Sequence, residues 1–262
     1  MIIEPVGVFR CREQYPYDAP RQGEVAGENA GLVELYAGHN FEQALQDLEG
    51  FSRIWLLFQF HVNANWKPLV LPPRGKRKVG VFASRAPYRP NGIGISCVKL
   101  VGVRGLCVAV CGHDLLDGTP ILDIKPYLPY ADSFPDAVCG WVDALEEVAW
   151  AVRFSQQARA QLDWLKSQGV DCLERFLCQQ LSAAPFDARR KRLRRLDQQR
   201  WEIAYRTWRA CFKVEEDRSA IVVEAILSGY RPAALAGGAD RYGDKGIHKA
   251  FEQAFGRAGA AE

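Results

Sequence analysis

The stretch Arg85-Ala86-Pro87-Tyr88-Arg89-Pro90-Asn91-Gly92-Ile93-Gly94 lies between two apolar runs, residues 79–82 and 95–103, that are typical of β-strands. Its two prolines fix the backbone angle φ at two points, and its two glycines relax φ at two others. Arg85, Arg89 and Asn91 add hydrogen-bond donors to this loop. A loop of defined shape with polar groups between strands suits a binding site. A hairpin turn with solvated arginines is the alternative that this stretch leaves open.

A second stretch, Asp117-Gly118-Thr119-Pro120, is a turn signal, and residues 121–125 after it alternate as a short strand does. Both stretches place polar groups in turns beside apolar strands. We therefore expect the two turns to face one cleft.

These two stretches carry a family resemblance. The patterns R-x-x-x-R-P-N-x-I-G-x-S at residues 85–96 and D-G-T-P-I-L-D-I-K-P-Y at residues 117–127 resemble the TrmO family, also called TsaA-like or YaeB-like proteins. The resemblance runs from about residue 3 to 142 and fades after residue 150. Gly92 departs from the family pattern, which usually has proline there.

The resemblance implies an enzyme. Members of the family are tRNA methyltransferases that use S-adenosylmethionine to methylate N6 of threonylcarbamoyladenosine at position 37, in the anticodon loop. The family fold is a β-barrel, and its members form homodimers. The cofactor-binding residues that the resemblance implies are Gln22, Gly23, His61, Val62, Arg85, Ile95, Asp117, Gly118, Thr119 and Pro120. By its sequence context alone, His61 also fits a structural histidine at the end of a strand.

Methylation of this N6 nitrogen requires loss of its proton, so a general base is needed. Asp123 and Tyr127 are candidates, and the threonyl carboxylate of the substrate is a third. Arg89 can bind that carboxylate through a bidentate fork, and Asn91 is a further donor on the same loop. The sequence does not rank the three bases.

The first 145 residues contain about seven strand-like runs and one helix-like segment, joined by short turns. The run 54–60 is apolar at nearly every position, as in a strand buried on both faces, and residues 103–106 fit a tight hairpin link. Consecutive strands predict an antiparallel β-barrel or sandwich. A Rossmann-type methyltransferase is disfavoured because no G-x-G-x-x-G follows a strand. We predict a β-barrel, S-adenosylmethionine-binding domain at residues 1–148.

The sequence pattern of residues 149–262 predicts a smaller domain with helical and mixed structure. Helical spacing over 158–165 and 173–181 indicates two helices, residues 203–214 and 219–226 fit a hairpin, and 245–255 fit one more helix. Residues 189–195 hold six cations in seven positions with few acids nearby. Such a segment suits a grip on the tRNA backbone, and a solvated basic face is the alternative.

Composition narrows the class of protein. With 48% hydrophobic and 25% charged residues, the chain fits an ordinary soluble protein, and a net charge of +3 is weak evidence for nucleic acid. No run reaches the length of a membrane-spanning helix and no signal peptide is visible, so we expect a cytoplasmic protein. The 8 cysteines show no C-x-x-C pair and the 4 histidines are scattered, so we predict no metal site.

Two other functions remain open on the sequence alone. A non-catalytic RNA-binding β-barrel protein would hold phosphate groups with the arginine-rich loop and perform no chemistry. A metal-dependent hydrolase would use Asp114, Asp117 and Asp123, although their spacing does not match an EF-hand loop. Binding of S-adenosylmethionine separates the methyltransferase from both.

Overall fold

The computed structural model describes residues 2–16, 29–63, 65–72, 75, 77–145, 150–182, 185–186, 192–215 and 220–256. The chain divides into two compact units, Met1–Leu145 and Glu146–Glu262, and each is described by itself. Gln22, Gly23 and residues 189–191 lie outside the described residues.

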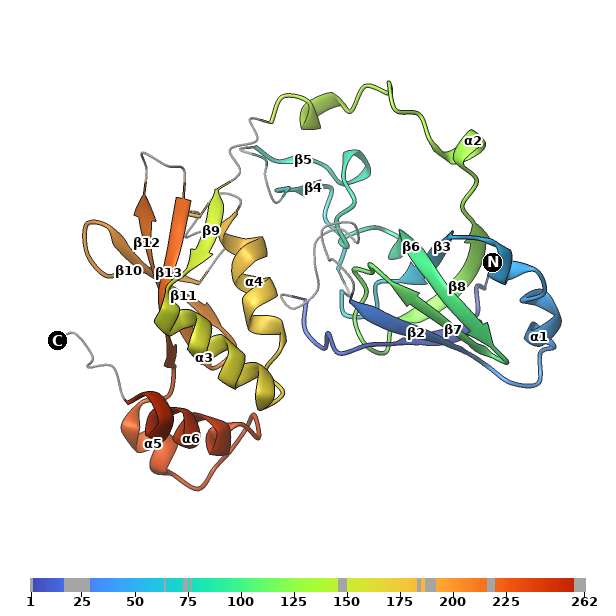
Figure 1. Ribbon diagram of the computed structural model, residues 1–262. Helices are drawn as coiled ribbons and strands as arrows, with labels where there is room; N and C mark the ends of the chain where they lie inside the picture. The colour runs from blue at the N-terminus through green and yellow to red at the C-terminus, as the bar shows by residue number, and fades with distance from the viewer. Residues whose placement is uncertain are drawn as a thin grey trace. The chain divides into compact units, whose positions relative to one another are not determined.

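The first unit is built on a closed barrel with the strand order β1-β2-β7-β6-β3-β8 (Figure 1). Every neighbouring pair around the barrel is antiparallel, so the predicted antiparallel β-barrel is confirmed. The strands are Gly7–Arg10 (β1), Ala30–Leu35 (β2), Arg53–Gln59 (β3), Ile93–Arg104 (β6), Cys107–Cys111 (β7) and Pro120–Pro126 (β8).

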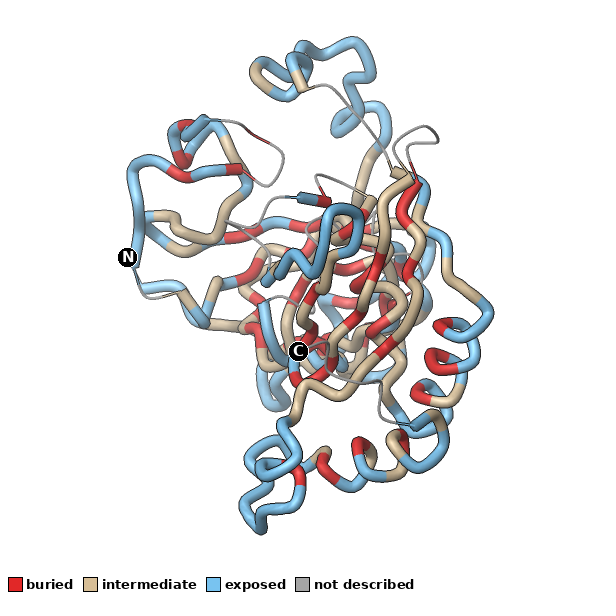
Figure 2. The backbone as a smooth tube through the Cα atoms, turned by 90° about the vertical axis from the view of Figure 1, so that its left-hand side faces the viewer, coloured by how far each residue is buried: buried red, intermediate tan, exposed pale blue. Residues whose placement is uncertain are grey.

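Strand β3 shows how the barrel is filled. Ile54, Leu56 and Phe58 are buried inside, whereas Trp55 and Leu57 alternate outward and are only half-buried. The prediction that this run is buried on both faces is wrong, because a closed barrel packs side chains only on its inner face. The same alternation appears in Figure 2, where buried positions recur as short red segments along the strands.

Shorter elements surround the barrel. They are the paired strands Leu69–Val70 (β4) and Val79–Gly80 (β5), the helices Phe41–Ala44 (α1) and Pro129–Asp132 (α2), and the 3₁₀ turns Leu48–Gly50, Val81–Ala83 and Gly140–Val142. Two expectations fail here. The one helix-like segment expected in this unit, residues 41–48, ends as a helix at Ala44, and Asp47, whose φ is +65°, separates it from the turn Leu48–Gly50. The strand expected at 79–82 ends at Gly80, where the 3₁₀ turn begins. The tight link between β6 and β7 is confirmed, with Gly105 at φ +56°.

The second unit holds a five-stranded sheet with the order β10-β11-β12-β13-β9. Only β9 and β13 pair in parallel. Its strands are Ala151–Phe154 (β9), Leu193–Arg195 (β10), Arg200–Tyr205 (β11), Trp208–Glu215 (β12) and Ala220–Ser228 (β13). Its helices are Gln156–Ser167 (α3), Cys172–Leu181 (α4), Pro232–Ala236 (α5) and Lys245–Phe255 (α6). This composition confirms the expected mixed C-terminal fold, and all three expected helices are present.

One face of this sheet is covered. Ile203, Tyr205, Phe212 and other inward residues of the strands form one apolar core with residues of α3, α4 and α6, such as Leu165, and the ribbons of α3 and α4 lie over the sheet in Figure 1. The hairpin expected from residues 203–214 and 219–226 is present as β12 paired with β13, but 203–214 is not a single strand. The chain turns at Arg206, where φ is +49°, so this stretch forms two strands, β11 and β12.

A buried polar network attaches α6 to the sheet. The ring of His248 stacks on Trp208 with 3.7 Å between ring centroids. Its Nδ1 lies 2.8 Å from Ser228 Oγ, its Nε2 lies 3.0 Å from Thr207 Oγ1, and Asp244 Oδ2 lies 3.6 Å from Nε2. Burial lowers the pKa of His248 to about 4, although the Asp244 carboxylate opposes this shift. The imidazole is therefore held neutral at pH 7.

Candidate active site

Strand register brings the two sequence motifs to the same end of the barrel. Gln59 at the end of β3 pairs with Ile93 at the start of β6, and Pro120 at the start of β8 pairs with Val8. The loops 60–92 and 112–119 therefore leave the barrel at this end, which we call the motif end. The pairing of the barrel strands, and not closeness in the sequence, brings the two motifs to the same end of the barrel.

A direct contact joins the first motif to the loop that leads into the second motif. Ser96, the last residue of the first motif, donates from Oγ to Oδ1 of Asp114, which lies just before the second motif. Burial raises the pKa of Asp114 above its usual range, and the hydrogen bond from Ser96 and the positive charge of Arg85 oppose that shift. Arg85 itself is exposed. The site thus presents an accessible guanidinium near a buried carboxylate. The sequence analysis did not anticipate the Ser96–Asp114 contact, because the two residues belong to different strands' ends.

The D-G-T-P turn is anchored on β1. The N–H of Asp117 donates to the Glu13 carbonyl and the N–H of Gly118 to the Phe9 carbonyl, both at 2.8 Å. Asp117 Oδ1 accepts the N–H of Cys11 at 3.1 Å. Gly118 has φ +76°, a conformation that glycine adopts without strain. The turn therefore has a fixed backbone, as a binding loop requires.

Arg89 has a structural role in the first motif. Its Nη1 donates to the carbonyl oxygens of Val81 at 3.1 Å and Ser84 at 2.8 Å, and so holds the 3₁₀ turn against the loop. A fork onto a carboxylate must then use Nε and Nη2. Gly92 has φ +62° and donates its N–H to the Arg89 carbonyl at 3.2 Å. Proline can do neither, so this loop differs from the usual family backbone at that position.

Of the other expected cofactor residues, Thr119 is buried and donates from Oγ1 to the Leu116 carbonyl, whereas His61, Val62 and Ile95 are accessible. His61 follows β3 and is exposed, Val62 is 52% exposed, and Ile95 is 48% exposed on β6. Ile95 points away from the barrel interior, since its neighbours Gly94 and Ser96 are buried. Asn91 is also exposed.

The two expected bases differ in their place relative to this group. Asp123 pairs in register with Leu57, which also pairs with Ile95, so Asp123 lies two strands from Ile95 on the outer face. The Asp123 side chain is 46% exposed and pairs with Lys125 Nζ at 2.7 Å, so it faces outward on β8. Tyr127 follows the far end of β8, where its N–H donates to the Arg53 carbonyl. A seven-residue strand spans roughly 20 Å, so within one barrel Tyr127 lies far from the D-G-T-P turn.

A third polar cluster lies at the motif end. Cys11, Glu13 and His113 place possible metal-ligating atoms within 4.8 Å of one another. In the part of the chain that the structure describes, this is the one such group of three, so Asp114, Asp117 and Asp123 do not gather as the hydrolase alternative requires. Burial raises the pKa of the Cys11 thiol to about 12.

The second unit presents basic side chains on the face of its sheet opposite the apolar core. We call the outward side chains Arg194, Arg200, Glu202, Arg209, Lys213 and Glu224 the open sheet face. Register places Arg200 beside Lys213 and Arg194 beside Glu202. Arg194 pairs with Glu202 at 3.2 Å, so the acids that partly balance these cations come from the neighbouring strand and not from the arginine-rich segment.

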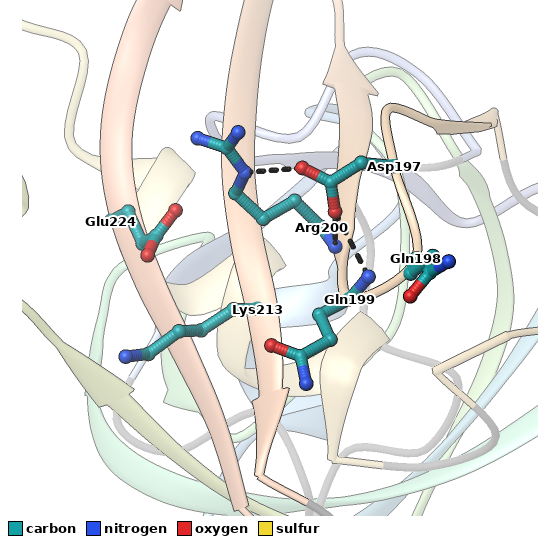
Figure 3. A pocket seen from close by; sticks show the side chains of 6 residues that line it. All are labelled: Asp197, Gln198, Gln199, Arg200, Lys213 and Glu224. Atoms are coloured by element: carbon teal, nitrogen blue, oxygen red, sulfur yellow. Dashed lines mark hydrogen bonds and ion pairs between the residues drawn. The ribbon is translucent and has the colours of Figure 1, made fainter.

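A hollow at one edge of this face is lined by Asp197, Gln198, Gln199, Arg200, Lys213 and Glu224 (Figure 3). Asp197 Oδ1 accepts the N–H groups of Gln199 and Arg200, and Oδ2 lies 2.6 Å from Arg200 Nε. These contacts hold the pKa of Asp197 at about 2. The turn between β10 and β11 is thus fixed, and Lys213 projects beside it.

Comparison with known proteins identifies the family to which this chain is similar. Residues 8–133 match the model of the tRNA-methyltransferase O N-terminal domain. The tRNA (adenine(37)-N6)-methyltransferase of Escherichia coli is 37% identical over 72% of this chain and 83% of its own length. A protein of the same name from Eikenella corrodens is 37% identical over 68% of this chain and 98% of its own length.

Two proteins of Pseudomonas aeruginosa extend the comparison. One, 46% identical over 61% of this chain and 70% of its own length, is provisionally named an S-adenosylmethionine-dependent methyltransferase. The crystal structure of TrmO from the same species matches with a TM-score of 0.62 and 32% identity, over 87% of this chain and 98% of that one. The shared motifs, the barrel and this coverage lead to one conclusion: the chain belongs to the TrmO family.

Proposed function

We propose that this protein is an S-adenosylmethionine-dependent tRNA methyltransferase that acts on N6 of threonylcarbamoyladenosine at position 37. The observation that carries the proposal is the contact between Ser96 and Asp114, which joins the first family motif to the loop before the second at one end of the barrel. The names of the relatives support tRNA as the substrate and adenine N6 as the acceptor. In this reading residues 1–148 hold the methyl donor and residues 149–262 contact tRNA.

The motif end suits the donor. S-adenosylmethionine carries a carboxylate, and Arg85 offers an accessible guanidinium for it. The anchored turn offers backbone groups in fixed positions. When bound, the cofactor supplies a methyl group that is already activated on sulfur. We assign its contacts to Gln22, Gly23, His61, Val62, Arg85, Ile95, Asp117, Gly118, Thr119 and Pro120.

With an activated methyl group, the main task of the protein is positioning. A bond forms between N6 and the methyl carbon, the bond from that carbon to sulfur breaks, and the N6 proton must be accepted. We assign this role to the substrate's own carboxylate, because Asp123 already pairs with Lys125 and Tyr127 follows the far end of β8. Arg89, through Nε and Nη2, and Asn91 would orient that carboxylate.

The tRNA backbone is assigned to the second unit. Arg194 and Arg200 have side chains that are 69% and 59% exposed, and Lys213 is 41% exposed. Basic side chains in register on a flat sheet suit a series of phosphate groups, and such contacts position an RNA without reading its sequence. The anticodon loop is assigned to the barrel, and an unpaired base of that loop is presented at lower cost than one from a duplex.

The assembly and location are also proposals. Val101, 63% exposed, and Ile95 lie on the outer face of β6, and a homodimer that covers this strand would remove both apolar side chains from water. Light scattering that gives the mass of one chain at working concentration would exclude it. Within the described residues, no helix has the length and apolar character needed to cross a bilayer. We place the reaction in the cytoplasm, together with its tRNA substrate.

Methyl transfer from labelled S-adenosylmethionine into two forms of one tRNA tests the proposal. We expect transfer into tRNA that carries the threonylcarbamoyl group and little into tRNA with plain adenosine, because the second lacks the carboxylate for Arg89. Equal rates on both would refute the carboxylate assignment. A folded protein that binds tRNA but takes up no S-adenosylmethionine in calorimetry would favour the non-catalytic RNA-binding alternative.

A further inference from the structure

Three side chains that ligate transition metals meet beside the D-G-T-P turn. Nε2 of His113 lies 3.8 Å from Oε2 of Glu13, and these side chains are 0% and 3% exposed. The half-buried Sγ of Cys11 completes a group whose candidate ligand atoms all lie within 4.8 Å of one another. The three residues come from the end of β1 and the end of β7. Thiol, carboxylate and imidazole are the three ligand types that zinc uses in proteins.

We propose that Cys11, Glu13 and His113 bind one divalent transition-metal ion, with zinc as the first candidate. Typical zinc–ligand distances of about 2.0–2.3 Å put the ligands of a tetrahedral site roughly 3.3–3.7 Å apart. The observed separations require the ends of these side chains to move inward by about 1 Å to reach that geometry. Binding converts the Cys11 thiol to a thiolate, and its proton passes to the solvent. Glu13 binds as a carboxylate and His113 as a neutral imidazole.

The surroundings hold His113 in place. Its backbone N–H donates to Asn29 Oδ1 at 3.2 Å, and its backbone carbonyl accepts from Asn29 Nδ2 at 3.0 Å. The ring packs edge-on against Phe9 with 4.7 Å between centroids. The Ala30 carbonyl lies 3.3 Å from Nε2 and competes with an ion for that nitrogen. The fourth ligand position is left to a water or to the Leu115 carbonyl, which lies 3.6 Å from Sγ.

The position of this cluster suggests a structural role. The Cys11 N–H donates to the Asp117 carboxylate, and the Glu13 carbonyl accepts the Asp117 N–H. An ion held by Cys11, Glu13 and His113 would therefore tie the end of β1 to the turn that carries Asp117. The proposed methyl transfer needs no Lewis acid, so the ion acts on the shape of the loop. This inference goes beyond the proposed function and does not depend on it.

Cobalt(II) is the probe of choice, because a thiolate ligand gives cobalt a charge-transfer band in the near ultraviolet. The full-length protein is stripped with a chelator, refilled with cobalt and then titrated with zinc. We expect one ion per chain, a sulfur-to-cobalt band, and displacement of cobalt by zinc. Cys11→Ser should abolish the band and weaken zinc binding by at least the roughly 10–100-fold that loss of an outer partner costs.

Cys107→Ser is the matched control, since Cys107 is a half-buried cysteine of β7 outside the cluster. It should keep the band and the zinc affinity of the wild type. Glu13→Gln gives a second test, with the thiol retained and zinc affinity reduced, if circular dichroism shows that Cys11→Ser is unfolded. A wild type without the sulfur-to-cobalt band, or zinc affinity equal in the wild type and a folded Cys11→Ser or Glu13→Gln variant, would overturn the proposal. Neither readout uses tRNA or S-adenosylmethionine, so failure here leaves the proposed function untouched.

Discussion

The two units are both built on β-sheet, yet they expose polar groups in different ways. The barrel closes on itself, so its inner face is filled by apolar side chains and its polar motifs lie in loops at one end. The sheet of the second unit stays open, and its described helices pack on one face, while polar side chains lie on the other face. In a closed barrel the polar groups of a site gather in loops at one end, whereas in an open sheet they can be distributed over one face.

This difference matches the two tasks of the proposed enzyme. A small cofactor needs a few groups held in fixed positions, and the anchored turn at Asp117 provides them. A nucleic-acid backbone is long and regular, and cations in register on Arg200, Lys213 and their neighbours suit it. The comparison predicts that changes in one unit affect one ligand and spare the other.

The largest expected effect concerns tRNA. Changing Arg194, Arg200 and Lys213 to Gln should weaken binding to all tRNAs alike, because phosphate contacts carry no sequence information. The slope of log affinity against log salt should fall by about 0.7 to 0.9 for each phosphate group that the variant no longer neutralises. The measurement is tRNA affinity over a salt series. An unchanged slope would leave the open sheet face as solvated surface, and S-adenosylmethionine affinity serves as the control that should not move.

Arg85→Ala should weaken S-adenosylmethionine binding and leave tRNA binding unchanged. Loss of a charge-assisted hydrogen bond costs about 1.5–3 kcal/mol, so S-adenosylmethionine should bind about 10- to 100-fold more weakly. Arg85 lies on a loop and is exposed, so the fold should persist. Arg104→Ala, at the opposite end of β6, is the control with wild-type cofactor affinity. Calorimetry that finds equal affinity for a folded Arg85→Ala variant would remove this residue from the site.

Gly92→Pro tests the shape of the loop. Proline cannot reach φ +62° and cannot donate the hydrogen bond that the Gly92 N–H makes to Arg89, so we expect a shift of the whole first motif. The cofactor should bind several-fold more weakly while the thermal stability of the second unit stays the same. Gly80→Ala is a milder control, because nothing lies within 4 Å of its added Cβ. Wild-type affinity in Gly92→Pro would show that the loop tolerates the usual family backbone.

The smallest expected effect concerns the stability of the second unit at low pH. The pKa of His248 is about 4 in the fold and about 6.5 when the chain is unfolded, so the unfolded state binds more protons between these values. The second unit should therefore keep its full stability above about pH 6.5 and lose some of it as the pH falls toward 4. Thermal unfolding at pH 7 and pH 5 measures this loss. His248→Asn should flatten the dependence, and His39→Asn, in the exposed part of the first unit, should not.

The sequence predicted local features better than spatial relations. Helix α6 was bounded correctly at Lys245–Phe255, since its apolar spacing is a property of one segment. Strand β3 was misjudged because an outward position on a barrel can also be apolar, as Trp55 and Leu57 are. The turn at Arg206 gave no Gly or Pro signal, so two strands were merged into one.

The same contrast between local features and spatial relations applies to the candidate site. Arg85 and the D-G-T-P turn were found because each motif is contiguous in the sequence. The Ser96–Asp114 contact and the grouping of Cys11 with His113 depend on strand pairing, which no spacing rule contains. The prediction of no metal site relied on C-x-x-C spacing, which does not consider residues that strand pairing brings together, and the ion proposed at Cys11, Glu13 and His113 would contradict it. The roles of Asp123 and Tyr127 stay predictions.

The parallel pairing of β9 with β13 has a consequence for synthesis on the ribosome. The barrel has all its strands once β8 has emerged, so the first unit can fold while the rest of the chain is still being made. The second unit begins with β9, whose partner β13 is the last strand of the sheet. Until β13 emerges, β9 is a strand with an unpaired edge, and its helices α3 and α4 have no complete sheet to cover. Chaperone contact during translation should therefore be concentrated on the second unit.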